Sequence, residues 1–311
     1  MTNNSAVLVL CPNNMTSPSN GPNGFLGDRI HQLPSVIVAT QAYSQVFIWP
    51  LDPFTKQVFQ FLPVKFIQKN TPEGVFREAT NLGIKMVIGL YAKPINLPTG
   101  REKDCETVNL CHEIAEKVTP ENVVIPNDLD PRGLIPIWQQ LAITVRRQVN
   151  KKSKLPSLPF LSPTNEYRKW GVDLLNQKAK EKPVIVASPL SGGDKKTVND
   201  QWWRELAKQY SHGHILVPVW EGYLQRANAI FGSQPNISVV SANIAQIAGL
   251  SSKNGVHVLG IDGGNMNVMA ASRSTGVLTI YGEWPASAWA MPNVVVRDPS
   301  ITPAEAIRDV P

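Results

Sequence analysis

Two segments near opposite ends of the chain share one pattern that restricts the fold. Residues 24–34 carry a glycine-bearing turn with an acid after an apolar strand, and residues 258–271 repeat the arrangement. In both segments a helix-like run follows the turn. Glycine in such a turn lets backbone N–H groups approach a ligand, and a helix start favours an anion. One such turn in each half predicts two αβ domains that face one cleft.

Apolar runs that suit buried parallel strands alternate with helix-like runs along the chain. In the first half, strands are expected at 6–11, 46–49 and 85–91, and helices at 30–42 and 109–117. In the second half, helices are expected at 166–180, 200–210, 223–231, 243–250 and 265–273, and strands at 183–188, 215–219, 237–240, 256–261 and 277–281. Thr302-Pro303-Ala304-Glu305 is a capping box that predicts a last helix. This alternation is typical of mostly parallel sheets covered by helices.

A basic stretch with three prolines, residues 151–163, suits an interdomain connection. The predicted domains are therefore residues 1–160 and 161–311, each Rossmann-like. At 311 residues the chain is long enough for two such domains with large cores.

Cysteine usage and hydropathy indicate the compartment. Cys11, Cys105 and Cys111 form no CxxC pair, and their odd number argues against a disulfide framework. The first residues lack a signal-peptide pattern, and no apolar run approaches the roughly 20 residues of a spanning helix. We therefore expect a cytoplasmic protein.

The formal charge of +6 suits an anionic partner, such as nucleotide phosphates, acidic lipid headgroups or DNA. A soluble basic surface explains it equally well, because the cations are scattered and form no long block.

Leu26-Gly27-Asp28, followed by His31 and Leu33-Pro34, resembles the opening motif of family 9 glycosyltransferases. That family includes the heptosyltransferases of lipopolysaccharide core synthesis. Residues 187–206 resemble its strand, lysine-bearing phosphate loop and Trp-x-x-Leu helix, and residues 260–271 resemble its Asp-Ser/Thr-Gly-x-x-His-x-x-Ala-Ala motif. Two positions depart from the family pattern: Gly263 replaces Ser or Thr, and Asn267 replaces His.

The resemblance implies the two-domain GT-B fold, with the acceptor bound mainly by the N-terminal domain and the nucleotide sugar by the C-terminal domain. It assigns Asp28 as the general base on the acceptor hydroxyl. It assigns Lys196 as a phosphate contact, and Asp262 with its following turn to the donor site.

The chemistry of the residues agrees with these roles. Inverting transfer needs a carboxylate that takes the hydroxyl proton, and positive charge or N–H dipoles that stabilise the departing diphosphate. Asp28, in a glycine turn at a helix start, suits the first role, although it would serve equally as a helix N-cap. His31 shares a helix face with Asp28 and could orient the acid or the acceptor, or simply be a structural histidine.

The candidate donor residues lie in the second half. Gly192, Gly193, Lys195 and Lys196 belong to a loop between a strand and a helix, which suits phosphate. The chemistry of the two lysines does not decide which of them contacts phosphate, whereas the spacing to Trp203 favours Lys196. The remaining candidates are Asp262, Gly263, Gly264 and Asn267 around the second turn, and Trp220 and Glu221 after a strand. Two consecutive glycines permit close approach to a pyrophosphate. Asn267 could form a hydrogen bond with the donor. Asp262 could bind the donor or be a structural residue of the turn. Trp220 and Glu221 could contact the nucleotide base or ribose, or simply pack against a loop.

No metal signature is present, since His112, His212, His214 and His257 lack ligand spacing and no Asp-x-Asp occurs. We therefore expect a metal-independent inverting glycosyltransferase without a cofactor, whose donor is a nucleotide sugar. The likeliest acceptor by resemblance is a lipid-linked saccharide, with peripheral contact to the inner membrane face. Two alternatives remain open: transfer to a modified base in DNA, flipped into the cleft, and a non-catalytic relative that binds a nucleotide sugar, which the Asn267 departure suggests.

Overall fold

Every strand pairing in the described part of the chain is parallel, and the strands form two separate sheets. The computed structural model describes residues 3–12, 26–91, 106–119, 122–126, 129, 135–149, 152–191, 198–282 and 286–311. The chain divides into residues 1–157 and 158–311, apart from residues 287–289, which group with the first unit. The division thus falls after Ser157, whereas the sequence suggested a boundary after residue 160.

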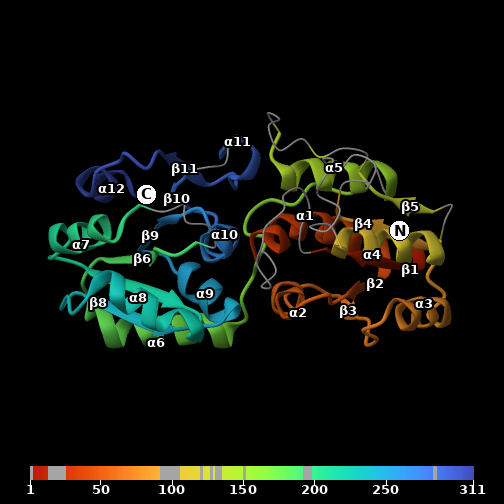
Figure 1. The fold of residues 1–311 in the computed structure, drawn as a ribbon, viewed down its shortest axis with the longest axis horizontal. Coiled ribbons are helices and arrows are strands. Elements are labelled where there is room, and N and C mark those ends of the chain that lie inside the picture. The colour runs from red at the N-terminus through yellow and green to blue at the C-terminus, as the bar shows by residue number, and fades with distance from the viewer. Residues whose placement is uncertain are drawn as a thin grey trace. The chain divides into compact units, whose positions relative to one another are not determined.

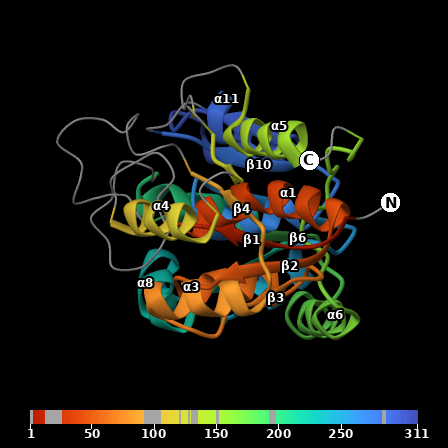
Figure 2. The same ribbon diagram turned by 90° about the vertical axis from the view of Figure 1, so that its right-hand side faces the viewer.

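The first unit contains a five-stranded sheet in the order β3-β2-β1-β4-β5 (Figure 1). Its strands are β1 (Asn3–Leu10), β2 (Tyr43–Trp49), β3 (Lys65–Phe66), β4 (Met86–Gly89) and β5 (Val123–Val124). Its helices are α1 (Leu26–Ala42), α2 (Pro53–Phe59), α3 (Pro72–Asn81), α4 (Glu106–Val118) and α5 (Ile137–Val149). Helix α5 packs along α1, and α3 packs on α4. Figure 2 shows α1 and α5 together on one side of this sheet.

Helix α1 begins earlier than the sequence suggested, at Leu26 instead of residue 30. Pro34 therefore lies inside the helix and not near its start. Proline cannot donate the hydrogen bond that a helix interior requires. The helix continues through it because Ile30, Leu33, Val36 and Val38 are fully buried, so tertiary packing outweighs the local cost.

The second unit contains a six-stranded sheet in the order β11-β10-β9-β6-β7-β8. Its strands are β6 (Val184–Ser188), β7 (His214–Val219), β8 (Ile237–Ser241), β9 (Val256–Ile261), β10 (Val277–Ile280) and β11 (Val294–Arg297). Its helices are α6 (Asn165–Ala179), α7 (Asp200–Gln209), the 3₁₀ turn η4 (Glu221–Tyr223), α8 (Leu224–Phe231), α9 (Ile244–Ser251), α10 (Gly264–Ala271) and α12 (Pro303–Asp309). The short α11 (Ala286–Trp289) includes the residues 287–289 that group with the first unit.

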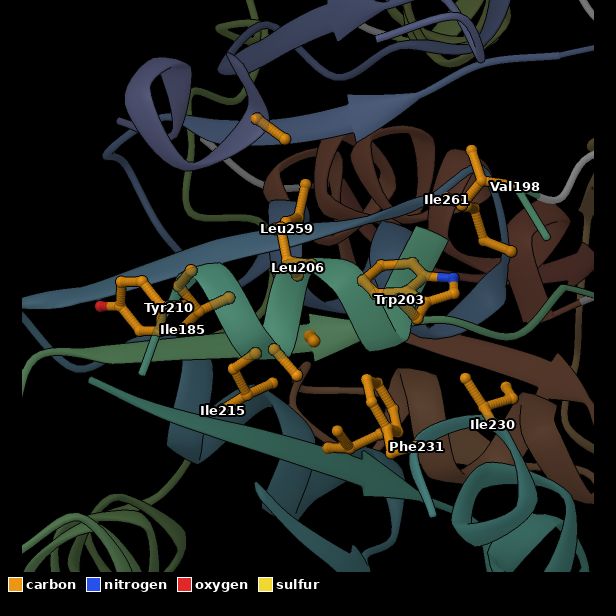
Figure 3. Packing of buried hydrophobic residues seen from close by; sticks show 14 of the residues in the cluster. Ile185, Val198, Trp203, Leu206, Tyr210, Ile215, Ile230, Phe231, Leu259 and Ile261 are labelled. Atoms are coloured by element: carbon orange, nitrogen blue, oxygen red, sulfur yellow. The ribbon is translucent and has the colours of Figure 1, made fainter. Parts of the chain in front are cut away.

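The core of the second unit forms where α7 and α8 pack on the sheet (Figure 3). Trp203 of α7 is fully buried, and its ring meets Phe231 of α8 edge to face with centroids 6.1 Å apart. Such aromatic pairs add about 0.5–1.5 kcal/mol to the stabilisation that comes from buried area. This contact fixes α7, which follows the segment carrying Lys195 and Lys196 in the sequence, against α8.

The structure confirms two Rossmann-like α/β domains. It also contains elements that the sequence analysis did not predict: α2, β3, α3, β5, α5, α11 and β11. Among the described residues, no helix is both long enough and apolar enough to cross a membrane.

Candidate donor and acceptor sites

Each sheet has one point at which the direction of strand addition reverses. In the second unit, β6 comes first, β7 and β8 follow on one side, and β9 to β11 follow on the other. The reversal thus lies between β6 and β9. Ligands of open α/β sheets bind at the carboxyl ends of strands beside such a point. Ser188 ends β6 there, and Asp262 follows β9.

Helix α10 starts at this point without a capping side chain. Its N-cap residue is Gly263, whose backbone is extended (φ −175°), and Gly264 opens the helix. The first N–H groups of a helix have no partner within the helix. A glycine cap supplies no side-chain acceptor, so these N–H groups and the positive end of the helix dipole can receive an anion. Gly264 is half-buried, so this end of the helix retains access to solvent.

Two glycines bring α10 and β9 close to the end of β6. A β-carbon at Gly263 would lie 3.1 Å from the carbonyl oxygen of Leu190 and 3.4 Å from the Cα of Ser191. A β-carbon at Gly260 would lie 2.8 Å from the Cβ of Ser188. The helix start therefore lies against Leu190 and Ser191, which directly precede residues 192–197. The close approach also gives a physical reason for glycine at 263, where the resembling family has Ser or Thr.

The predicted loop residues Gly192, Gly193, Lys195 and Lys196 lie outside the described residues. Their roles remain predictions. Among the described residues, no group of three or more His, Cys, Asp or Glu side chains is placed to hold a metal ion.

Asp262 and Asn267 are both largely buried at this site, with 6% and 9% of their surfaces exposed. The backbone N–H of Asp262 donates to the carbonyl of Ile280 at 3.0 Å, which ties the turn to the end of β10. Burial raises the pKa of the neighbouring Tyr281 well above its usual value, and the charge of Asp262 adds to this rise. The backbone N–H of Asn267 donates to the carbonyl of Gly263 at 3.0 Å, so Asn267 lies one helical turn beyond the cap, as predicted.

Trp220 lies at the same end of the sheet, directly after β7. Its indole N–H donates to Oδ1 of Asn265, in the first turn of α10, at 3.1 Å. Glu221 is exposed, and its carboxylate accepts a hydrogen bond from the Ser241 hydroxyl at 2.7 Å. The structure therefore brings Trp220 to the start of α10 through Asn265, a residue that the sequence analysis did not single out.

In the first unit the reversal lies between β1 and β4, and α1 begins at the carboxyl end of these strands. The backbone of Asp28 belongs to the first turn of α1, while its side chain lies outside the described part of the structure. His31 follows three residues later in the same helix and is 1% exposed. The prediction that Asp28 and His31 lie three residues apart in one helix is confirmed, whereas the chemical role of each remains a prediction.

Arg29, beside Asp28, is the centre of a buried polar network that sequence analysis missed. Its guanidinium is 1% exposed and forms an ion pair with Asp52, whose side chain is 8% exposed. The Nε donates to Asp52 Oδ2 at 3.1 Å and to the Thr55 hydroxyl at 3.0 Å, and Nη1 donates to the carbonyl of Pro12. Asp52 also caps α2, since its Oδ1 accepts the N–H groups of Phe54 at 2.8 Å and Thr55 at 3.0 Å.

Gln32 extends this network to both central strands. Its amide donates to the carbonyl of Pro12 at 3.2 Å and to that of Leu90 at 3.3 Å, next to the ends of β1 and β4. The first two turns of α1 are thus held to both strands at the reversal point and to the start of α2. Nearby, burial raises the pKa of the Cys11 thiol to about 12, although the charge of Arg29 opposes the rise. The thiol therefore stays protonated at neutral pH.

One signal for this network was present in the sequence. Arg29 and Gln32 lie among apolar residues that form one buried helix, and a charged residue in such a helix requires a partner. The partner, Asp52, lies 23 residues away, so its identity depends on the fold.

Comparisons with solved structures found chains of the same architecture. The glycosyl transferase family 9 structure from Veillonella parvula covers 99% of this chain and 92% of its own length, with a TM-score of 0.71 and 14% identity. The ADP-heptose lps heptosyltransferase II of E. coli covers 98% of this chain and 96% of its own, with a TM-score of 0.68 and 12% identity. The E. coli heptosyltransferase WaaC with ADP-2-deoxy-2-fluoro heptose covers 97% and 98%, with a TM-score of 0.62 and 14% identity.

No protein-family model and no curated protein sequence matches this chain. The structural likeness, at such low identity, concerns the fold. It confirms the predicted GT-B class, an α/β protein with two Rossmann-like domains.

Replacing Arg29 tests the buried network. Arg29→Met should lower the free energy of unfolding by about 3–5 kcal/mol, because it leaves the buried carboxylate of Asp52 without its counter-charge. The matched control is Arg226→Met, which breaks the exposed ion pair of Arg226 with Asp200, at 2.8 Å, and should cost at most about 1 kcal/mol. Urea unfolding of both variants measures the difference, and equal losses would contradict a stabilising role for the network.

Proposed function

We propose that this protein is an inverting glycosyltransferase that uses a nucleotide-diphosphate sugar. The observation that carries the proposal is the uncapped start of α10 at the reversal point of the second sheet. It lies against Leu190 and Ser191, directly before the Gly-Gly-Asp-Lys-Lys segment. Uncapped N–H groups and nearby lysines are the features that bind and stabilise a diphosphate leaving group. The WaaC neighbour, whose fold this chain shares, was solved with a nucleotide-sugar analogue.

In this proposal the second unit holds the donor. The backbone N–H groups at Gly264 and the following residues receive the pyrophosphate, and Lys196 or Lys195 adds positive charge. Asn267 faces the donor from the second turn of the helix, and Asp262 orders the turn. Trp220, held by Asn265, and the exposed carboxylate of Glu221 meet the base or ribose.

The first unit holds the acceptor, and Asp28 acts as general base. The first turn of a helix favours an ionised carboxylate, which is the form that accepts a proton. As the acceptor hydroxyl oxygen bonds to the anomeric carbon, its proton passes to Asp28. The bond to the diphosphate breaks, and its electron pair stays on the departing oxygen. Attack from the opposite side inverts the anomeric centre. His31 orients the acid or the acceptor, and neither a metal ion nor a cofactor is required.

By resemblance the acceptor is a lipid-linked saccharide, which would bring the protein to the inner membrane face. A modified base in DNA is the second candidate.

The proposed donor site is tested by thermal shift with a panel of ADP-, UDP- and GDP-sugars. A ligand that binds only the folded protein raises its unfolding temperature. We expect one nucleotide class to do so, and Lys196→Ala to weaken its binding roughly tenfold to a hundredfold, because a charge-assisted hydrogen bond is worth about 1.5–3 kcal/mol. The loss should shrink for the free nucleoside. A larger effect of Lys195→Ala would transfer the role to Lys195, and no effect of either variant would contradict the phosphate site.

Asp28→Asn tests the chemical step. Transfer should fall by roughly 10² to 10⁴, the usual contribution of a general base. Donor binding should stay within a few-fold, since asparagine keeps the shape of the side chain. Single-turnover transfer and donor titration measure the two effects separately. Turnover near the wild-type rate would remove Asp28 from the mechanism.

Asn267 separates an adapted enzyme from a binding relative. Asn267→Ala should weaken donor binding by about 1 kcal/mol, the net value of a neutral hydrogen bond. Asn267→His, which introduces the residue of the resembling family, should reduce an existing activity if asparagine suits a different donor or acceptor. That is the result we expect. A gain from undetectable turnover would identify the natural protein as a binding relative, and unchanged binding and rate in both variants would place the donor elsewhere.

A further inference from the structure

Strand β7 contains a proline although it lies in the interior of the second sheet, between β6 and β8. Its backbone N–H groups alternate in direction. The N–H of His214 donates to the residue just before β6, and that of Ile215 donates to the residue just before β8. Pro218 therefore occupies a position that faces β6, and it has no N–H to donate there. The pairing of β6 with β7 accordingly ends at Val186 and Leu216.

Beyond that point β7 is paired with β8 alone. This pairing continues through Pro218 to Val219, which lies opposite Ser241. On its other side, β6 stays paired with β9 up to Ser188 and Gly260. The backbone pairing at the carboxyl edge of the sheet is thus interrupted between β6 and β7, although the proposed donor site requires both sides of β6 to hold one ligand.

The side chain of Asn265 bridges this interruption. Asn265 is half-buried in the first turn of α10, which follows β9. Its Oδ1 accepts the indole N–H of Trp220 at 3.1 Å, and its Nδ2 lies 3.5 Å from the carbonyl oxygen of Pro218, a long hydrogen bond. Because β9 and β7 are the two neighbours of β6, the contact passes from one neighbour to the other across the end of β6. One amide side chain therefore connects the end of β7 to the start of α10.

The segment that Asn265 holds carries the candidate contacts to the nucleoside. We call residues 220–223 the β7 loop. The N–H of Tyr223 donates to the carbonyl of Trp220 at 2.8 Å and closes the loop into a turn. Glu221 and Tyr223 are exposed, and Trp220 is half-buried. The carboxylate of Glu221 accepts the hydroxyl of Ser241 at the end of β8. The β7 loop is thus held toward β8 by Glu221 and toward α10 by Trp220.

The bond between Asn265 and Trp220 affects position more than stability. A neutral hydrogen bond between half-buried groups contributes little net stability, because each group would otherwise bond to water. Its direction nevertheless fixes the indole relative to the first N–H groups of α10. A ligand that contacts both the β7 loop and the helix start binds more tightly when the two are already ordered, since ordering a loop costs binding free energy.

We propose that Asn265 is a positioning residue that couples the two parts of the donor site. It holds the β7 loop, which contacts the nucleoside, in place relative to the start of α10, which receives the diphosphate. The inference rests on the proposed donor site and names the part of the ligand that Asn265 affects. A nucleoside diphosphate uses both parts, whereas inorganic pyrophosphate uses the helix start alone. Loss of the Asn265 side chain therefore weakens binding of the nucleotide and leaves binding of pyrophosphate unchanged.

The test titrates the full chain with ADP, UDP and GDP by calorimetry, and measures inorganic pyrophosphate by displacement of the nucleotide that binds best. Asn265→Ala removes the acceptor of the bond, and Trp220→Phe removes the donor while keeping an aromatic ring. Each should weaken nucleotide binding roughly fivefold, the size of one neutral hydrogen bond. The double variant should lose no more than the larger single loss, because both changes remove the same bond. The affinity for pyrophosphate should stay the same in all three.

Trp202→Phe is the matched control. It removes another indole hydrogen bond of the second unit, from Trp202 to the carbonyl of Ile301 at 2.7 Å, and it should retain the affinities for both ligands. Unfolding temperatures close to that of the wild-type protein verify that each variant has folded.

The outcomes separate this inference from the proposed function. If the wild-type protein binds a nucleotide and Asn265→Ala binds it equally well, Asn265 has no positioning role and the donor site stands. Losses that multiply in the double variant would show that the two residues act independently, and an equal loss for pyrophosphate would assign Asn265 to the phosphates; either result overturns the coupling. If the wild-type protein binds none of the three nucleotides, or if pyrophosphate displaces none, the proposed donor site fails together with this inference.

Discussion

The proposed donor site depends on how closely three backbone segments approach one another at the reversal point of the second sheet. Parallel pairing brings the carboxyl ends of β6 and β9 to the same edge. Gly260 lets β9 lie against Ser188, and Gly263 lets the start of α10 lie against Leu190 and Ser191. Any β-carbon at Gly260 would collide with Ser188 at 2.8 Å and move these segments apart. The absence of two side chains therefore places a helix start beside Leu190 and Ser191, which directly precede the segment of the candidate lysines in the sequence.

The first unit achieves the same placement of a helix start by the opposite means. There, a buried charge holds α1, since Arg29 connects the helix to Asp52, Thr55 and Pro12. Burying an ion pair contributes little net stability relative to apolar packing, because both charges lose their hydration. The pair instead positions the first turn of α1, because the directional hydrogen bonds of Arg29 restrict where that turn, which contains Asp28, can lie. The proposed donor site thus depends on close packing in its unit, and the proposed acceptor site depends on directional polar contacts in its own.

Most of the second unit could be predicted from the sequence, because most of its strands are buried runs rich in Val, Ile and Leu that alternate with helices. The predicted strand 256–261 agrees with β9 at both ends, and the capping box at Thr302 opens α12. The first unit was predicted less completely. β3 and β5 contain two residues each, too few for a recognisable pattern. The starts of α2 and α3 did carry signals, since Asp52-Pro53 and Thr71-Pro72 each pair a capping side chain with a proline at the first helical position.

The sequence by itself determined the α/β class, the division into two Rossmann-like halves and the two turns where ligands are expected, because hydrophobic periodicity and glycine position are local properties. Only the tertiary structure decided which distant residues meet. The pairing of Arg29 with Asp52, the contact of Trp220 with Asn265 and the approach of Gly263 to Leu190 each join segments far apart along the chain. The continuation of α1 through Pro34 is also a tertiary effect. Such contacts follow from how helices and strands pack, and packing depends on the whole core rather than on any local pattern of residues.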